Sequence, residues 1–293
     1  MNSSAILRKL ELYEKLLRLD KPIGILLLLW PTLWALWLAT EGRPTWAIVW
    51  IFCLGTVLMR SAGVAVNDYA DRNFDGHVAR TKDRPLAAGL IKPREALIVA
   101  AVLAMLAFIL IVPFGRLVIL LSFCALFLAV SYPFMKRFFV LPQAYLGVAF
   151  GFGIPMAYAA ETEGVPSIAW ILLAANISWT LAYDTEYAMV DREDDRKIGI
   201  HTAAILLGRF DVATVLLCYA IFVGVMGWIG WSLHLAWPYY AGLGGALALG
   251  GYQYALIRDR DPRGCFRAFL CNNWVGALIF AGIVLAFVLP RHA

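Results

Sequence analysis

Long apolar segments recur along almost the whole chain, and they restrict it to folds that place most of their helices in a lipid bilayer. Nine of them approach the roughly 20 residues that a membrane-spanning helix needs, at about 23–40, 46–66, 95–113, 116–133, 140–159, 167–188, 210–231, 238–257 and 268–288. Only 15% of the 293 residues are charged and 62% are hydrophobic, compared with about 25% and 45–50% in a soluble domain. We therefore predict an all-α polytopic membrane protein with nine transmembrane helices.

The distribution of lysine and arginine over the loops predicts how these segments are oriented. Nearly all of the 25 lysines and arginines fall on the side that holds the N-terminus and the loops after the even-numbered segments. The other side has only Arg43, Arg116 and Arg291. Because basic loops stay in the cytoplasm, we expect the N-terminus there and the C-terminus on the far side. The net charge of +5 is spread over many short loops, so it does not indicate a nucleic-acid partner, and no obligate protein partner is evident.

Residues 1–20 have the pattern of a helix that lies on the cytoplasmic membrane surface. Apolar side chains recur at helical spacing, and basic ones occupy much of the other side. The apolar set is Ile6, Leu7, Leu10, Tyr13, Leu16 and Leu17, and the basic set is Arg8, Lys9, Lys15 and Arg18. A cleavable signal peptide is not expected, because no long apolar core and no small-residue cleavage site precede Lys21. The five cysteines lack metal-ligand spacing and are expected to be reduced packing residues.

Two acidic clusters stand at the ends of the second and sixth segments, where charge is otherwise scarce. The first cluster is Asn67, Asp68, Asp71 and Asp75, and the second is Asp191 and Asp195. On a helix, Asn67, Asp71 and Asp75 would share one stripe, and Asp191 and Asp195 another. Like charges at this spacing repel one another unless a cation neutralises them. Mg²⁺ is typically held by one or two carboxylates together with substrate phosphate oxygens, so the clusters predict a Mg²⁺ site for a phosphorylated substrate.

The alternative is that these acids are ordinary loop carboxylates paired with nearby arginines. Equivalent placement of both clusters weakens that alternative, because the clusters are four segments apart along the chain. This spacing indicates a single domain, residues 1–293, in which segments 1–4 and 5–8 form a pseudo-repeat and segment 9 is additional. Such repeats are also common in transporters, so the repeat alone does not indicate an enzyme.

Basic residues close to the clusters are candidates for contact with phosphate. Lys82 and Arg84 lie in the loop after the first cluster, and Lys136 and Arg137 follow the fourth segment. Guanidinium and ammonium groups there are suited to bind a diphosphate and to stabilise it as it leaves. The simpler interpretation is that these basic residues only keep their loops on the cytoplasmic side of the membrane.

Two charged residues lie within apolar segments. Arg60 is seven residues before Asn67, hence about two turns deeper on the same face. A lone charge there is costly, so Arg60 either pairs with an acid of the site or binds a substrate carboxylate. Asp184 lies near the end of the sixth segment and has either a functional role or a hydrogen-bonded structural one.

Many of these residues belong to a long and specific sequence motif. It runs Asn67-Asp68-x-x-Asp71-x-x-x-Asp75, then Arg80-Thr-x-x-Arg84-Pro-Leu, then Tyr183-Asp-Thr-x-Tyr-Ala-Met-x-Asp191-Arg-x-Asp-Asp195. It resembles the intramembrane aromatic prenyltransferase superfamily, and most of all the bacterial 4-hydroxybenzoate polyprenyltransferases of ubiquinone biosynthesis. The resemblance extends over nearly the whole chain and includes Tyr132-Pro-Phe-Met-Lys136-Arg137.

The resemblance implies nine helices around a central cavity in the bacterial inner membrane, with the active site facing the cytoplasm. It implies Mg²⁺-dependent transfer of a polyprenyl group from polyprenyl diphosphate to C3 of 4-hydroxybenzoate, which yields 3-polyprenyl-4-hydroxybenzoate and diphosphate. The implied metal ligands are Asn67, Asp68, Asp71, Asp75, Asp191 and Asp195, of which Asp71, Asp75, Asp191 and Asp195 would be catalytic. The implied diphosphate-binding residues are Arg72, Lys82, Arg84, Lys136 and Arg137, and the implied aromatic-substrate residues are Arg60, Tyr183 and Asp184.

Two alternatives to this function remain open at the level of sequence. One is a related prenyltransferase with another acceptor, such as a naphthoate, a haem or a chlorophyllide. The other is a secondary transporter, which repeats and buried acids would suit. Transporter sites lie near the bilayer midplane, whereas these acids are expected at the cytoplasmic ends of their segments, and this difference favours the enzyme.

Overall fold

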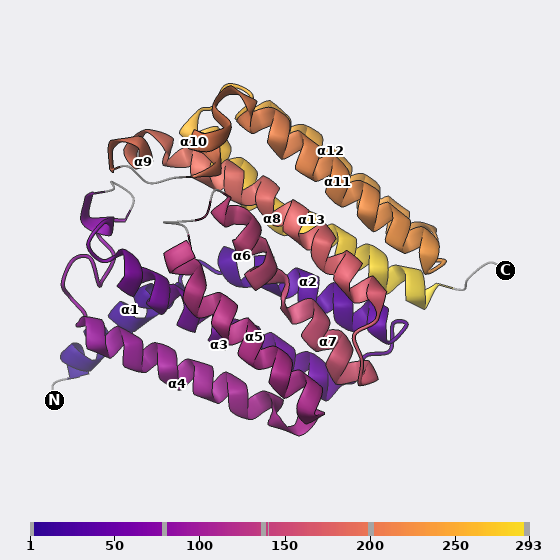
Figure 1. Ribbon diagram of the computed structural model, residues 1–293, viewed down its shortest axis with the longest axis horizontal. Coiled ribbons are helices and arrows are strands. Elements are labelled where there is room, and N and C mark those ends of the chain that lie inside the picture. Colours follow the sequence, from indigo (N-terminus) through magenta and orange to yellow (C-terminus); the bar gives the residue numbers. More distant parts are fainter. Residues whose placement is uncertain (1–2, 78–80, 136–138, 140, 199–201, 290–293) are drawn as a thin grey trace.

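The computed structural model describes residues 3–77, 81–135, 139, 141–198 and 202–289, and within these ranges it contains helices and no strands (Figure 1). The helices are α1 Ser3–Leu16, α2 Ile23–Ala39, α3 Trp46–Asp71, α4 Pro93–Ile111, α5 Gly115–Met135, α6 Pro142–Gly151, α7 Gly153–Thr162, α8 Ser167–Val190, α9 Arg192–Ile198, α10 Ala203–Leu207, α11 Asp211–Ser232, α12 Trp237–Ile257 and α13 Pro262–Val288. Short 3₁₀ turns are η1 Asp75–His77, η2 Val112–Phe114 and η3 Gly208–Phe210.

Helices lie in each of the apolar ranges predicted from the sequence, but they do not all qualify as membrane spans by length and composition. Four stretches of the described chain are long and apolar enough to cross a bilayer, and these are Trp46–Asp71, Pro93–Met135, Ala203–Ser232 and Pro262–Val288. Helix α2 is apolar but shorter. The chain is therefore an all-helical, multi-pass membrane protein. Its nine crossings and the cytoplasmic position of its N-terminus stay predictions.

The predicted fifth segment is divided into two helices, α6 and α7, which meet at Phe152. Pro155 has no amide hydrogen to donate to the carbonyl of Gly151, so the helical ladder loses a bond at this point. Gly151 and Gly153 on either side also lower helix propensity. Gly153 lies close to Thr32 of α2, and a side chain on it would overlap that hydroxyl group. The break thus brings α7 against α2.

The core is built from aromatic residues of α2, α8 and α11. The rings of Trp179 and Phe222 stack with centroids 5.5 Å apart, and Trp34 lies 5.3 Å from Trp179. Buried Asn272 of α13 accepts hydrogen bonds from the indole of Trp179 at 2.8 Å and the hydroxyl of Tyr219 at 3.0 Å. These bonds satisfy polar groups that would be costly to bury alone. The core therefore fixes α8 relative to α11 and α13.

The helices run between two ends of the molecule, and both acidic clusters lie at one of these ends. Figure 1 shows α1, α9, α10 and the segment after α3 together at the left, whereas the C-terminal end of α13 lies at the right. Helices α3, α4 and α5 form one side, and α11 and α12 form the other. Helices α4 and α5 turn large apolar side chains outward, among them Ile98, Leu120 and Phe127, as expected for a surface in contact with lipid.

Candidate active site

Both acidic clusters line one cavity of about 1690 Å³. The cavity wall includes every residue of the two clusters, together with Arg60, Arg84, Tyr183 and Asp184. Residues that are far apart in the chain and were selected from the sequence therefore line the same cavity. The remaining wall near α4 and α5 is apolar and includes Met105, Phe123, Leu126 and Val130, whose side chains are exposed. The cavity is thus charged at one end and apolar along α4 and α5.

The first cluster is not a single helical stripe, and in this respect the sequence prediction was wrong. Helix α3 ends at Asp71, and Asp75 belongs to the 3₁₀ turn that follows. Within α3, the amide of Asn67 donates a hydrogen bond to Asp71 at 3.1 Å. Asp75 is turned back toward them because the hydroxyl of Thr81 donates to its carbonyl at 2.8 Å and Arg84 donates to its carboxylate at 2.8 Å. The loop therefore supplies the third acid of the cluster.

The sequence had placed Asp191 and Asp195 on one helix, and this prediction was also wrong. Helix α8 ends at Val190, Asp191 lies between helices, and Asp195 belongs to α9. The amide of Asp195 still donates to the carbonyl of Asp191 at 2.9 Å, which preserves one helical turn. Both carboxylates consequently remain on the cavity wall.

Two arginines partner the acids of the first cluster. Arg18 donates to both carboxylate oxygens of Asp68, at 3.0 and 3.2 Å, and Arg84 donates to Asp68 at 3.2 Å and to Asp75 at 2.8 Å. Burial raises the pKa of the Asp75 carboxyl group above its usual value, and the charge of Arg84 opposes that shift. Burial also lowers the pKa of the Arg18 guanidinium, and Asp68 opposes this.

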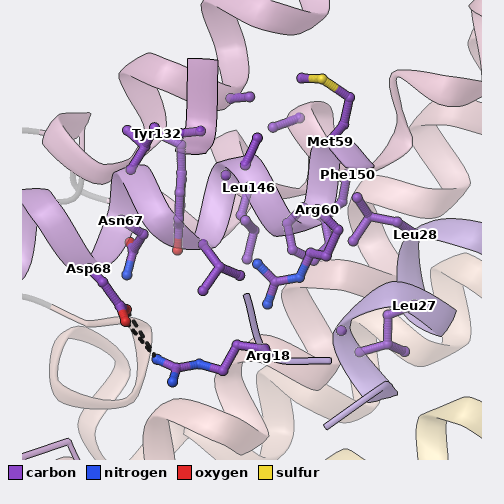
Figure 2. Close-up of a pocket in the computed structure, with 18 of the residues that line it drawn as sticks. Arg18, Leu27, Leu28, Met59, Arg60, Asn67, Asp68, Tyr132, Leu146 and Phe150 are labelled. Atoms are coloured by element: carbon purple, nitrogen blue, oxygen red, sulfur yellow. Dashed lines mark hydrogen bonds and ion pairs between the residues drawn. The ribbon is translucent and has the colours of Figure 1, made fainter. Parts of the chain in front are cut away.

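Arg18 was not recognised from the sequence as a site residue. It was counted only among the basic residues of an amphipathic N-terminal helix. The structure places it on the cavity wall beside Asp68 (Figure 2). No signal in the spacing of the residues distinguishes it from Arg8 or Lys15, because the contact depends on how the end of α1 turns.

Arg60 lies in α3 on the cavity wall, apart from the Arg18–Asp68 pair (Figure 2). Its guanidinium carbon is 5.4 Å from the ring centroid of Phe150 in α6. Its Nε is buried and has no hydrogen-bond partner in the described part of the chain. A Cβ atom added to Gly24 of α2 would lie 2.7 Å from Nε and Nη2, so that glycine leaves the space that the guanidinium fills.

The other predicted basic residues are placed differently. Arg72 is not on the wall of the main cavity but lines a smaller one of about 450 Å³. There its guanidinium lies 4.3 Å from the ring centroid of Tyr69 and donates to the carbonyl of Tyr69 at 2.6 Å. Lys82 is exposed. Lys136 and Arg137 lie outside the described residues, so their contacts with phosphate stay predictions.

A buried ion cluster holds the second acidic cluster in place. Asp211, at the start of α11, is fully buried. It accepts hydrogen bonds from Arg192 at 2.8 Å and from Arg260 at 2.7 Å. Arg192 also donates to the carbonyl of Gly208 at 2.8 Å. Because Arg192 directly follows Asp191, this cluster connects α9 with α11 and with the loop before α13.

The cavity wall fits a magnesium ion by the chemistry of its donors. The carboxylate oxygens of both clusters and the amide oxygen of Asn67 are the hard ligands that Mg²⁺ prefers. Within the described ranges, no group of three or more histidine, cysteine, aspartate or glutamate side chains is close enough to hold a metal ion alone. Mg²⁺ usually keeps several waters and uses one or two carboxylates plus substrate phosphates. The donors therefore suit a metal held jointly by protein and diphosphate.

Comparison with known proteins gives one consistent result. Residues 28–276 match the model of the UbiA prenyltransferase family. A 4-hydroxybenzoate octaprenyltransferase from Thiobacillus denitrificans is 64% identical over 281 residues, which cover 96% of each chain. The apo structure of a UbiA homolog from Aeropyrum pernix K1 has a TM-score of 0.78 at 25% identity, covering 89% of this chain and 97% of that one.

A second solved structure shares the fold at lower identity. It is that of a UbiA homolog from Archaeoglobus fulgidus bound to GPP and Mg²⁺, with a TM-score of 0.69, 16% identity, and coverage of 95% of this chain and all of that one. At this identity the likeness is one of fold. The architecture described here is thus one that has been solved with a prenyl diphosphate and a divalent metal bound.

Proposed function

Because the chain belongs to the UbiA prenyltransferase family, we propose that it transfers a polyprenyl group from polyprenyl diphosphate to C3 of 4-hydroxybenzoate in ubiquinone biosynthesis. The observation that carries this proposal is the single cavity lined by both acidic clusters and by Arg60. Its charged end suits a diphosphate and an aromatic acid, and its apolar part suits a prenyl chain. The sequence relatives that share nearly the whole chain bear this activity in their names.

The acids of the two clusters are proposed to hold Mg²⁺ at the charged end of the cavity. Asn67, Asp71 and Asp75 would contribute from one side, and Asp191 and Asp195 from the other. When bound, Mg²⁺ supplies positive charge that favours departure of the diphosphate. Asp68, which the resemblance also implies as a ligand, is already contacted by Arg18 and Arg84.

Basic residues would bind the oxygens of the diphosphate and stabilise the charge that develops as the allylic carbon–oxygen bond breaks. Arg84 is proposed for this role, and its position on the cavity wall and its contacts with two acids of the first cluster support the proposal. Lys82, Lys136 and Arg137 complete the proposed set, whereas Arg72, which the sequence had also suggested, lines the smaller cavity and is not included. The apolar wall excludes water from the allylic cation until the aromatic ring attacks.

Arg60, Tyr183 and Asp184 would bind and orient 4-hydroxybenzoate. The guanidinium of Arg60 matches a carboxylate in charge and in fork geometry. It is already fixed by Phe150 and by the space at Gly24. The hydroxyl of Tyr183 accepts a hydrogen bond from Thr180 at 3.0 Å, which sets the position of the ring at the cavity wall. Ring carbon C3, activated by the adjacent phenol, then forms the new bond, and loss of its proton restores aromaticity.

The site is proposed to face the cytoplasm of a bacterial inner membrane. Lysine and arginine are concentrated in the loops at the end of the molecule that carries both clusters, as expected for cytoplasmic loops. The aromatic acid would enter from water at this end, and the prenyl chain would extend between α4 and α5.

Radiolabel transfer tests the proposed function directly. Purified protein in detergent is given labelled 4-hydroxybenzoate, a polyprenyl diphosphate and Mg²⁺, with EDTA as the control. We expect metal-dependent appearance of label in the organic phase. Transfer only to a naphthoate or another acceptor would identify a related prenyltransferase. Absence of transfer in detergent, together with substrate movement across sealed vesicles, would identify a transporter.

Replacing Arg60 by alanine is expected to raise KM for 4-hydroxybenzoate by about tenfold to a hundredfold, because a hydrogen bond to a charged group is lost. The KM for polyprenyl diphosphate should change much less, because the clusters and Arg84 remain. Steady-state kinetics with each substrate varied in turn measures the difference. The reverse order of effects would place Arg60 with the metal-binding residues instead.

Gly24 of α2 leaves the space that the guanidinium of Arg60 occupies. Gly24→Ala would place a methyl group 2.7 Å from the guanidinium, and the flexible end of Arg60 can move away at little cost to folding. We therefore expect KM for 4-hydroxybenzoate to rise by about threefold to tenfold, through a weakened charge-assisted hydrogen bond. Gly224→Ala is the control, since nothing lies within 4 Å of a Cβ atom there. An unchanged KM in Gly24→Ala would show that the position of the guanidinium does not matter.

A further inference from the structure

Arg18 occupies a backbone position that normally belongs to glycine. The amide of Leu19 donates to the carbonyl of Glu14 at 3.1 Å, and the amide of Arg18 donates to that of Lys15 at 3.3 Å. This is the pair of bonds of a Schellman motif, which ends α1, and Arg18 is the residue in the left-handed conformation, with φ of 56°. A side chain is disfavoured there, whereas glycine is relaxed. Arginine at this position therefore carries a conformational cost that glycine would not have.

The side chain of Arg18 reaches an acid of the first cluster, 50 residues further along the chain. Its Nη2 donates to both carboxylate oxygens of Asp68, at 3.0 and 3.2 Å, and Arg84 donates to one of them at 3.2 Å. The side chain of Asp68 is only 1% exposed. Two guanidinium charges in direct contact with one carboxylate oppose the approach of a divalent cation to the same group.

Helix α1 is held so that Arg18 arrives at this point. Leu16 is fully buried among apolar residues of α3, α4 and the loop between them. The hydroxyl of Tyr13 donates to Glu95 of α4, and Lys9 forms an ion pair with the same carboxylate at 2.9 Å. These contacts lie at one side of α1, whereas Leu7 and Leu10 remain exposed. The N-terminal helix is thereby fixed to the helices that carry the site.

From this arrangement we propose that Arg18 is a further diphosphate-binding residue and that Asp68 is its anchor rather than a metal ligand. The proposal rests on the proposed function and names one more residue of the same site. Asp68 engages Nη2, and the guanidinium has five N–H groups in a planar fork. Nη1 of Arg18 also donates to the carbonyl of Lys15 at 3.4 Å. Because Arg18 lies on the cavity wall (Figure 2), the N–H groups that these bonds do not use can donate to phosphate oxygens. Arg84 bridges Asp68 and Asp75 in the same manner, and the two arginines together form a pair of fixed cations beside the metal-binding acids.

Four variants and three readouts test this assignment. Arg18→Gly removes the side chain and relaxes the backbone, so a loss cannot arise from strain. Asp68→Asn removes the charge of the anchor, and Asp71→Asn is the comparison for loss of a metal ligand. Arg8→Ala is the matched control, because it removes an exposed arginine from the same helix. The readouts are Mn²⁺ binding by electron paramagnetic resonance, calorimetric titration with inorganic diphosphate and Mg²⁺, and KM for each substrate.

Arg18→Gly is expected to weaken inorganic diphosphate binding, and to raise KM for polyprenyl diphosphate, by about tenfold to a hundredfold through loss of a charge-assisted hydrogen bond. Its Mn²⁺ affinity and its KM for 4-hydroxybenzoate should match those of the wild type and of Arg8→Ala. Asp68→Asn should follow Arg18→Gly, with Mn²⁺ affinity nearly unchanged, whereas Asp71→Asn should lose Mn²⁺ affinity.

Two results would overturn the assignment. Loss of Mn²⁺ affinity in Asp68→Asn equal to that in Asp71→Asn would make Asp68 a metal ligand. Unchanged diphosphate binding in Arg18→Gly would reduce Arg18 to a structural contact. The titration with inorganic diphosphate does not depend on turnover, so absence of prenyl transfer by the wild type would refute the proposed function and still leave the role of Arg18 decided.

Discussion

Replacement of Asp71 or Asp191 by alanine is expected to lower kcat for prenyl transfer by about a thousandfold or more, while the protein still inserts and folds. Each substitution removes a carboxylate from the wall of the charged end of the cavity. The loss of a group aimed at charge that develops in the transition state is typically worth about 10²–10³ in kcat, and loss of a metal ligand adds to it. The measurement is single-turnover transfer at saturating Mg²⁺, together with size-exclusion chromatography in detergent.

The control for this pair is Asp259→Ala. Asp259 lies in the loop before α13, its side chain is 77% exposed, and its contact is with neighbouring Arg258. This substitution removes a carboxylate at the surface, away from the cavity, and should leave the rate of prenyl transfer unchanged. Robust turnover by Asp71→Ala or Asp191→Ala at high Mg²⁺ would contradict the assignment of these acids to the metal.

Asp211→Ala is expected to destabilise the protein by about 3 kcal/mol, because removal of one partner from a buried ion pair leaves uncompensated charge. Asp211 is fully buried, whereas its partners Arg192 and Arg260 are 16% and 38% exposed. Their partial access to water places the cost at the lower end of the range for buried pairs. For a chain of this size, that corresponds to a fall in melting temperature of roughly 5 °C, measured by thermal denaturation in detergent.

The same substitution should affect activity through the second acidic cluster. Arg192 follows Asp191 directly and is fixed by Asp211, so its release loosens the turn between α8 and α9. We expect a raised Mg²⁺ requirement in the folded fraction, and a smaller effect in Asp211→Asn, which keeps a hydrogen-bond acceptor. Wild-type stability in Asp211→Ala would show that the two arginines find water or other partners without cost.

The apolar ranges were predictable from the sequence, whereas two features of the helices were not. Helix α3 continues to Asp71, beyond the predicted end at about residue 66, because hydropathy falls where the acids begin and cannot distinguish a polar helical turn from a loop. The break between α6 and α7 at Phe152 lies among Gly151, Gly153 and Pro155, which weaken a helix without fixing where it breaks, and it is accompanied by the close approach of Gly153 to Thr32. Only the fold supplies that contact.

The site was predicted best where residue type and spacing determine chemistry. Both acidic clusters, Arg60, Arg84, Tyr183 and Asp184 lie on one cavity wall. The positions of Asp75 and Arg72 were less predictable, because each depends on the path of the chain after α3. Arg18 could not be found from its neighbours in sequence, since its partner Asp68 is 50 residues away and its orientation follows from the end of α1.

The apolar wall of the cavity along α4 and α5 has a consequence for how the enzyme meets its two substrates. Met105, Phe123, Leu126 and Val130 line the cavity and have exposed side chains. Under the proposed function, the aromatic acid arrives by diffusion in three dimensions, and the prenyl diphosphate arrives by diffusion in the plane of the bilayer. Supply of the lipid substrate then depends on its mole fraction in the membrane rather than on its amount per volume. Added inert lipid would slow the reaction by dilution in two dimensions, with no change in the protein.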